Sequence, residues 1–421
     1  MMGMVWKTGE TPSEKARLRV VYALMATAFC LPLNIFAMEF CFVIAVVLAA
    51  YYSWKYDVRS VSWIGVFLPA GLFAGISLIS LLGSPQALFG LGFYAFTVLQ
   101  YILMYILLIL FVRTASERHL VIVCLLISAA GTALYGIYPY SHMLTLHEAE
   151  WVDNSAFPLL KRRMYSTLYN PNLYSAFLLM MMGGTASMSI WTRHRWHRIG
   201  YAALFAALGL CLILTYSRGA WLSVAALVFF FGLVWDKRLW LLFLLIPPFL
   251  LFYHGGVTDR LLSIFYHSEA DTSVSMRLDM WYSAVEMIIE HPLLGVGWGA
   301  FKFVYPVYNE LIQEAGITIF HAHNMFLNIW AETGVLGFVS FFCFFYGNAY
   351  YGWKLLKMPQ VHTFDRSAAM MMIAAVVSQT ICGFSDYDLF STQISLTFWL
   401  ICGIFANAYI EYKKSLRNNS Q

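Results

Sequence analysis

The run FYAFTVLQYILMYILLILFV, residues 93–112, contains 20 residues and no charged side chain. An α-helix of about 20 apolar residues is long enough to cross the roughly 30 Å of hydrocarbon in a bilayer. A strand of a membrane β-barrel would instead alternate polar with apolar residues over about ten positions. This run does not alternate, and we therefore predict that it forms a transmembrane helix.

The rest of the chain has the same composition. Apolar residues make up 61% of the 421 residues and charged residues 11%, whereas soluble domains have about 45–50% and about 25%. The basic residues lie in short clusters at the ends of apolar runs, so no nucleic-acid-binding surface is indicated. The seven cysteines lie in or beside apolar runs, and we interpret them as small core residues. We expect residues 1–421 to form a single integral membrane domain.

Apolar runs of suitable length predict an all-α polytopic membrane protein with about 12 transmembrane helices. The predicted spans are 18–35, 37–54, 61–82, 93–112, 119–140, 171–190, 199–215, 219–235, 239–253, 325–347, 367–384 and 392–411. Between spans 9 and 10 lies a long polar stretch, residues 254–324, which we expect to be partly helical. A second polar stretch, residues 141–170, separates spans 5 and 6.

Sidedness follows from the basic residues, which concentrate in the cytoplasmic loops of membrane proteins. With the N-terminus inside, 19 of the 26 Lys and Arg residues fall on the cytoplasmic side. We therefore expect both termini to be cytoplasmic and the two polar stretches to lie on the outer face. The seven outer cations are exceptions to this rule and are candidates for binding an anion.

Two of these outer arginines stand where a helix begins or lies along the membrane. Arg218 in TYSRGAW (215–221) is expected at the start of a helix at the outer interface. Arg277 opens RLDMWYSAVEMIIE (277–290), an amphipathic pattern that predicts a helix on the membrane surface, with Ser275 as its N-cap and Pro292 beyond its end. Each arginine could bind a phosphate through its planar donor fork or extend to lipid headgroups.

The sequence HAHN (321–324) precedes the apolar run of span 10. His323 is a candidate general base, because histidine titrates near neutral pH, and His321 could support it. Asn324 could instead simply cap the following helix. The chain contains no HExxH or CxxC pattern, and we expect no metal and no cofactor.

Three acidic residues are weaker candidates. Glu332 falls inside span 10 and could orient a cation such as Arg218 or Arg277. Asp386 and Asp388 lie in an outer turn between spans 11 and 12. They could be catalytic, but we interpret this turn as a solvated one. The glycines of GVGWG (295–299) lack a βαβ context and indicate a tight turn.

Three stretches resemble the O-antigen ligase family, whose members also include O-antigen polymerases and bacterial O-oligosaccharyltransferases. The stretches are TYSRGAW at 215–221, RLDMW…HPLLGVGWGAF at 277–301 and HAHNMFLNIWAETGVLG at 321–337. The YNPN step at 169–172 is a further similarity. The three stretches lie within roughly residues 215–350, and the N-terminal half resembles the family in hydropathy.

The resemblance implies that a glycan is moved from undecaprenyl pyrophosphate to an acceptor hydroxyl at the outer face of the bacterial cytoplasmic membrane. His323 matches the family's essential loop histidine, and Arg218 and Arg277 match its pyrophosphate-binding arginines. Additional support could come from His321, Asn324, Glu332, Lys161, Arg162 and Arg163. The implied partners are the lipid-linked glycan, lipid A–core or another glycan acceptor, and membrane lipids.

Ligation of O-antigen to lipid A–core is the function we predict from these features. A polymerase of O-antigen or another surface polysaccharide would use the same chemistry. An oligosaccharyltransferase acting on protein is a further alternative, as is a transporter of lipid-linked glycan, which belongs to a different class.

Overall fold

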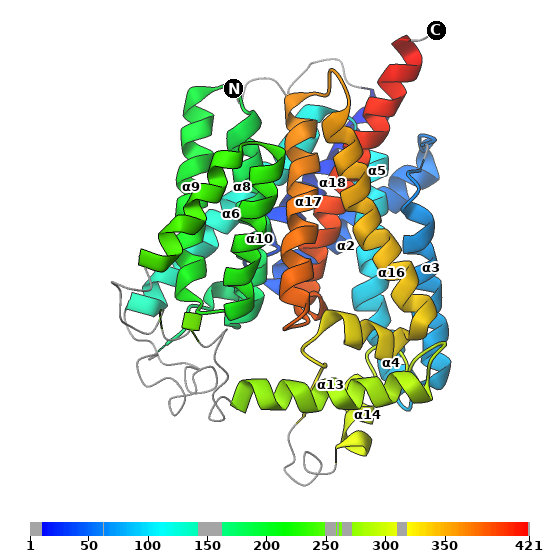
Figure 1. Ribbon diagram of the computed structural model, residues 1–421. Coiled ribbons are helices and arrows are strands. Elements are labelled where there is room, and N and C mark those ends of the chain that lie inside the picture. The colour runs from blue at the N-terminus through cyan, green and yellow to red at the C-terminus, as the bar shows by residue number, and fades with distance from the viewer. Residues whose placement is uncertain are drawn as a thin grey trace.

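The computed structural model of the protein describes residues 11–61, 63–141, 162–248, 258, 261–262, 272–309 and 318–419. Every regular element in these ranges is helical (Figure 1). The long helices form a bundle, helix α13 crosses one end of it, and the last helix, α18, projects beyond the other. These are named here the α13 end and the C-terminal end. The predicted all-α polytopic fold is confirmed.

Among the described residues, the bundle is built from eleven long helices and the shorter helix α4. They are α1 (Pro12–Cys30), α2 (Ile35–Lys55), α3 (Phe67–Ser80), α4 (Ala87–Tyr94), α5 (Gln100–Phe111), α6 (Ala115–Ser141), α8 (Pro171–Trp191), α9 (Arg195–Leu214), α10 (Arg218–Val234), α16 (Met325–Lys357), α17 (Thr363–Gly383) and α18 (Thr392–Asn419). A π-helical turn, η2 (Ala95–Leu99), joins α4 to α5. The remaining elements are η1 (Leu81–Gly83), η3 (Ser166–Leu168), η4 (Lys237–Leu245), α13 (Thr272–Glu290), α14 (Phe301–Tyr308) and η5 (Asp388–Phe390).

Eight helical stretches among the described residues are long and apolar enough to cross a membrane, and they correspond to predicted spans 2, 4–7 and 10–12. Spans 3 and 8 correspond to shorter apolar helices at 67–83 and 218–234. The predicted ninth span, 239–253, is not confirmed. Its first part belongs to the 3-10 helix η4, which packs against α10, and residues 249–253 lie outside the described part of the chain.

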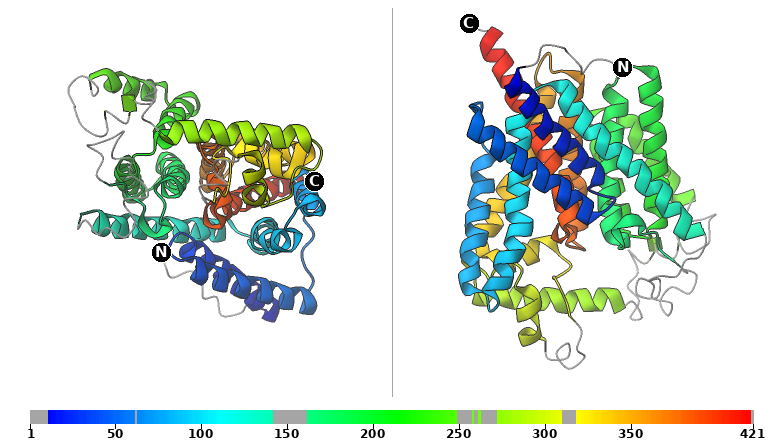
Figure 2. Two further views of the ribbon diagram at one scale, coloured as in Figure 1. Left: turned by 90° about the horizontal axis from the view of Figure 1, so that it is seen from below. Right: turned by 180° about the vertical axis from the view of Figure 1, so that it is seen from behind.

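Helix α17 lies at the centre of the bundle and packs against α8, α10, α16 and α18 (Figure 2). Small residues allow the closest of these approaches. A Cβ added at Gly183 of α8 would lie only 2.7 Å from the Cβ of Ala374 in α17. Such small-residue contacts are typical of helices that pack within a membrane. The rigid centre therefore fixes the two ends of α17 relative to its neighbours.

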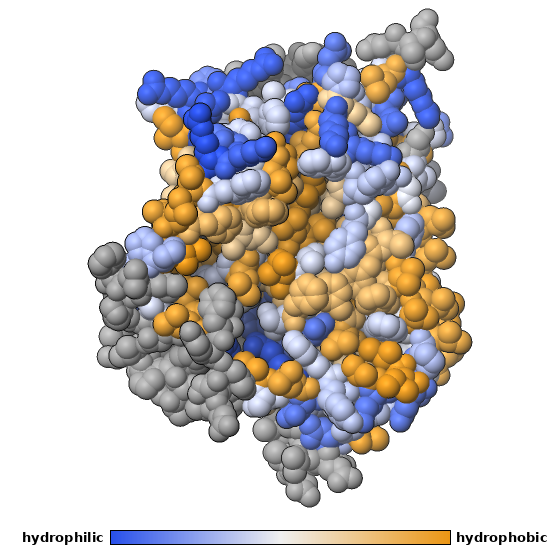
Figure 3. Space-filling model, in the orientation of Figure 1, coloured by the Kyte–Doolittle hydropathy of each residue, from blue (hydrophilic) through white to orange (hydrophobic). Residues whose placement is uncertain are grey.

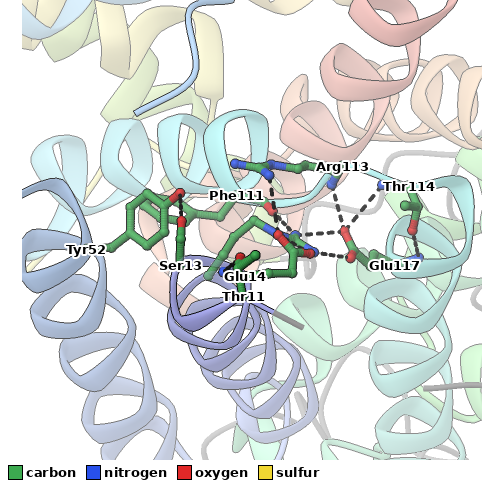
Figure 4. Close-up of polar contacts among 9 residues, drawn as sticks. Thr11, Ser13, Glu14, Tyr52, Phe111, Arg113, Thr114 and Glu117 are labelled. Carbon is green, nitrogen blue, oxygen red and sulfur yellow. Dashed lines mark hydrogen bonds and ion pairs between the residues drawn. The ribbon is translucent and has the colours of Figure 1, made fainter. Parts of the chain in front are cut away.

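Paired charges join α1 to α6 at the C-terminal end (Figure 4). Arg17 is buried, and its Nη2 lies 2.6 Å from Glu117 Oε1 while it also pairs with Glu14. Glu117 accepts the N–H of Thr114, whose hydroxyl accepts the N–H of Glu117 in return at 3.1 Å, which forms a capping box at the start of α6. Because a buried guanidinium is costly unless it is paired, this cluster fixes α1 against α6.

The surface shows the same two ends. Hydrophilic residues gather at the C-terminal end above a broad apolar belt (Figure 3). At the other end, α13 runs across the bundle with apolar side chains exposed, among them Leu278, Val285 and Ile289. This arrangement fits the predicted amphipathic surface helix. The expected N-cap at Ser275 is wrong, because α13 already includes Thr272.

Helix α16 breaks at Gly334, so the predicted span 325–347 is not one straight helix. Gly334 has φ 63° and ψ −174°, a region of backbone conformation that is essentially restricted to glycine. A short segment, 325–333, precedes the break, and the long bundle helix follows it. The Gly334 of the HAHN…G pattern is therefore the point at which the chain turns from the α13 end into the bundle.

The break holds the glycine-rich turn 292–301 in place. The turn donates the N–H of Val296 to the carbonyl of Ala331 at 2.8 Å and the N–H of Gly297 to the carbonyl of Glu332 at 3.0 Å. Val335 donates its N–H back to the carbonyl of Pro292 at 2.8 Å. Gly295, Gly297 and Gly299 all have positive φ, which confirms the expected tight turn.

Replacing Gly334 should destabilise the protein. The substitution Gly334→Ala places a Cβ 2.2 Å from the backbone of Leu293 and forces an unfavourable φ, so the free energy of unfolding should fall by about 1–3 kcal/mol. Gly92→Ala is the matched control, because a Cβ there has no neighbour within 4 Å. Melting of both variants in detergent measures the difference. Equal melting temperatures would contradict a structural role for the break.

Candidate active site

His323 and Asp386 meet at the α13 end of the bundle. His323 stands in the loop before α16, and Asp386 stands in the turn between α17 and α18. His323 Nδ1 lies 2.9 Å from Asp386 Oδ1. Because an ionised carboxylate can only accept a hydrogen bond, Nδ1 carries the proton and Nε2 is the basic nitrogen. The His323 side chain is 35% exposed, so a substrate can reach it.

The loop that carries His323 is fixed at its next residue. Asn324 accepts hydrogen bonds from the N–H groups of Phe326 and Leu327, both at 3.0 Å, so the predicted N-cap is confirmed. Its side-chain amide also donates to the carbonyl of Phe384 at 3.2 Å. Asn324 therefore joins the start of α16 to the turn that holds Asp386, and His323 adopts a left-handed φ of 47° between them.

Asp386 also binds the start of α8. Asn172 donates its amide to Asp386 Oδ2 at 2.7 Å, and its Oδ1 accepts from Arg163 Nη2, also at 2.7 Å. Arg163 Nε donates in turn to the carbonyl of Thr215 at 2.7 Å. These contacts form a continuous polar network from His323 to the segment before Arg218. Arg163, an expected substrate ligand, is buried and bonded within the protein in this structure.

The interpretation of residues 386–388 as a solvated turn is wrong, since both aspartates are buried. Burial acts to raise the pKa of Asp386, but His323, His321 and Arg277 outweigh it, and its pKa lies well below the ordinary value. Asp388 behaves in the opposite way. Burial and the charge of Asp386 raise its pKa well above the ordinary value, although Arg277 acts to lower it. The pKa values of the two carboxyl groups in this turn are therefore shifted in opposite directions.

Both predicted arginines lie near this turn. The charge of Arg277 on α13 is close enough to act on His321, Asp386 and Asp388. Arg218 is the first residue of α10, and the next residue, Gly219, approaches the turn so closely that an added Cβ would lie 2.5 Å from Ser385 Oγ. The structure therefore brings the start of α10, part of α13 and the His323 loop to one end of the bundle.

His321 lies beside His323, with their ring centroids 4.3 Å apart. Its Nδ1 accepts the backbone N–H of His323 at 3.2 Å, which stabilises the left-handed turn of the loop. Burial, the neighbouring His323 and Arg277 lower the pKa of His321 to about 4, although Asp386 acts to raise it. His321 is therefore neutral at physiological pH and supports the position of His323.

The structure gives Glu332 a different partner from the arginines suggested by the sequence. Its Oε1 accepts the N–H of Phe301 at 3.1 Å and so holds the end of the glycine-rich turn. Glu332 therefore supports the structure of the site.

Two candidate cations remain, Lys161 and Arg162. Arg162 places its guanidinium carbon 4.4 Å from the centre of the Tyr140 ring. Lys161 lies outside the described residues.

The side chains around His323 are also potential ligands of a metal ion. His321, His323 and Asp386 offer three ligand atoms within 4.8 Å of one another. In the structure, His323 and Asp386 already bind each other, and His321 Nδ1 accepts a backbone N–H. The expectation of a metal-free reaction stays a prediction.

Comparison with known proteins now adds to this geometry. Residues 202–342 match the family model described as O-antigen ligase. The resemblance seen in the sequence motifs is confirmed. Candidate polysaccharide ligases of Rickettsia typhi and Rickettsia prowazekii are each 28% identical over 138 residues. These alignments cover 32% of this chain and 31% of each relative, so the match spans about a third of either protein.

The O-antigen ligase match contains the predicted residues but not their partners. Arg218, Arg277 and His323 fall within 202–342, whereas Asn172 and Asp386 lie on either side of it. The sequence predicted neither contact: Asp386 was a weaker candidate in a turn interpreted as solvated, and Asn172 appeared only within the YNPN step. The YNPN step, which ends at Asn172, and the two aspartates of the 386–388 turn were visible signals, but neither indicates by itself which residue it contacts.

The low pKa of His321 predicts a loss of stability in acid. Between pH 6.5 and about 4 the unfolded state binds a proton at His321 that the folded state does not, so stability falls as pH falls through this window. His321→Asn should reduce this pH dependence by about 1–3 kcal/mol. Melting temperatures of both proteins from pH 8 to 4 provide the measurement, and the difference between them should be constant above pH 7. Parallel curves across the whole range would contradict a neutral His321.

Proposed function

We propose that the chain is a membrane glycosyltransferase that moves a glycan from undecaprenyl pyrophosphate to a hydroxyl of lipid A–core oligosaccharide. The observation that carries the proposal is the hydrogen bond between His323 and Asp386, which leaves a basic Nε2 on a partly exposed side chain. The match to the O-antigen ligase family and the relatives named as polysaccharide ligases support the substrate class.

His323 acts as the general base in this mechanism. A sugar hydroxyl is too weak an acid to ionise at neutral pH, so its proton must leave as its oxygen attacks. His323 Nε2 takes that proton while the acceptor oxygen forms a bond to the anomeric carbon of the glycan. The bond from the same carbon to the pyrophosphate oxygen breaks on the opposite face, and the configuration inverts. Asp386 stabilises the imidazolium that forms.

Arg218 and Arg277 stabilise the leaving group. The departing lipid pyrophosphate gains negative charge, so it requires cations more than a proton donor. Arginine presents a planar fork that binds phosphate oxygens in pairs. Both arginines lie near the turn of Asp386, where the start of α10 and α13 approach it. The reaction then proceeds without a metal ion or nucleotide sugar.

This site belongs on the outer face of the bacterial cytoplasmic membrane in the proposed orientation. The C-terminal end is hydrophilic (Figure 3). Lys354, Lys357 and Arg417 lie there, in the last turns of α16 and α18, and the sidedness rule places them in the cytoplasm. The α13 end, with its exposed apolar helix, would then lie at the outer surface. Both termini are cytoplasmic in this arrangement.

Loss of His323 or of Asp386 should abolish most of the glycan transfer. Purified protein is supplied with undecaprenyl-pyrophosphate-linked glycan, with or without lipid A–core, and product is measured on the acceptor. His323→Gln and Asp386→Asn should each reduce the rate by about 10²–10⁴-fold, because the base is removed or its correct tautomer is lost. His194→Gln is the control, since His194 is exposed at the start of α9, away from the site.

The same assay separates the alternatives. Longer carrier-linked chains without lipid A–core would identify a polymerase, and transfer to protein alone would identify an oligosaccharyltransferase. Full activity of His323→Gln would reject the proposed base. Activity that persists in a chelator is expected, whereas reversible loss would assign a metal to the histidine cluster.

Arginine geometry gives an independent test. Arg218→Lys and Arg277→Lys keep the charge but remove the paired donors, and each should lower the transfer rate by about tenfold to a hundredfold. The binding of added lipid pyrophosphate, the reaction product, to these variants should weaken in parallel. Arg238→Lys, at an exposed position of η4, is the matched control. Variants with unchanged rates and product binding would exclude these residues from the pyrophosphate site.

A further inference from the structure

A cavity of about 530 Å³ lies at the C-terminal end, remote from the candidate active site. Its walls are residues 59–61 and 63–65, the last turns of α16 and the last turns of α18. Helix α18 projects beyond the bundle at this end (Figures 1 and 2). Neither the proposed transfer reaction nor the matched family region involves this place.

The cavity has a strong excess of positive charge. Five basic residues line it, Arg59, Lys354, Lys413, Lys414 and Arg417, and its one acidic residue is Glu411. Glu411 already pairs with Arg59 at 2.7 Å. Basic residues therefore outnumber acidic ones in the lining of this cavity by five to one.

Arg59 holds this wall of the cavity in a fixed position. Besides Glu411, its guanidinium binds the carbonyl groups of Ile109 and Val112 at the end of α5. These contacts bind Arg59 to α5 and α18 and so fix the width of the cavity. A surface cluster that serves only to set membrane topology has no need of such a frame.

Aromatic side chains place the cavity at the membrane–water boundary. Tyr351 and Tyr409 line it with ring centroids 5.2 Å apart in an edge-to-face arrangement, and Trp63 lies at its side. Trp63 and the nearby Trp353 are each 40% exposed. Exposed tryptophan and tyrosine are typical of the depth at which lipid headgroups lie. A ligand in this cavity is therefore at headgroup level.

We propose that this cavity binds the phosphate headgroup of an anionic phospholipid. Basic residues close to the membrane end of a helix attract anionic lipid headgroups. The lysines of α18 would contact the phosphate, and the tyrosine rings would pack against the glycerol and upper acyl chains. A soluble phosphate shares this chemistry but would gain nothing from the apolar wall, and it is distinguished below.

Lipid binding by the full-length protein tests the proposal. The protein is purified in a neutral detergent, and phosphatidylglycerol or phosphatidylcholine is titrated while bound lipid is counted by native mass spectrometry. Lys413→Gln with Lys414→Gln should weaken phosphatidylglycerol binding by about tenfold or more, since two attractive charges are removed. The matched control is Lys237→Gln with Arg238→Gln, two exposed cations beside η4 that do not line the cavity.

Saturable phosphatidylglycerol binding that the control keeps and the cavity variant loses is the expected result. Equal loss in both variants would show a general charge effect and overturn the proposal. Equal binding of phosphatidylcholine would do the same. Displacement of the lipid by millimolar inorganic phosphate would assign the cavity to a soluble phosphate compound instead. The His323→Gln variant should bind the lipid normally, which separates this proposal from the transfer reaction.

Discussion

Buried backbone groups in a membrane protein must find hydrogen-bond partners inside the protein, and α16 meets this constraint at its break. Gly334 interrupts the helix, and the carbonyls of Ala331 and Glu332 accept N–H groups from the glycine-rich turn instead. The Glu332 carboxylate adds a third contact, to the N–H of Phe301. The turn and the break thus require each other. Their combined geometry sets the position of the short segment 325–333, whose N-terminus carries His323.

The site itself depends on a second set of contacts. Asp386 receives hydrogen bonds from His323 and from Asn172, and Asn172 is held by Arg163. Three segments distant in sequence, 163–172, the His323 loop and the Asp386 turn, therefore converge at the end of the central helix α17. Since α17 is packed on several sides, this end is rigid, and a general base supported there keeps its orientation without help from the substrate.

The sequence predicted features that depend on local chemistry. Long uncharged runs marked the membrane helices, and Asn324 before an apolar run marked an N-cap. Partners across the fold were harder to predict. Asp386 is 63 residues from His323 along the chain, and an aspartate in a polar turn is equally compatible with solvent and with a buried dyad. The run 239–253 stays unconfirmed as a span, because apolar composition alone does not distinguish a membrane helix from the 3-10 helix that forms over 237–245.

The two buried aspartates explain how one turn serves both partners in the proposed reaction. If Asp386 and Asp388 were both ionised, their charges would repel and would compete with the substrate for Arg277. Instead Asp388, whose Oδ1 has no hydrogen-bond partner among the described residues, has a pKa well above its ordinary value. Asp386, whose pKa is lowered, is directed at His323. In the proposed reaction, Arg277 would then be available to the pyrophosphate, and the imidazolium formed on proton transfer would already have its counter-ion. Pairs of carboxyl groups with opposite pKa shifts divide their roles in this way.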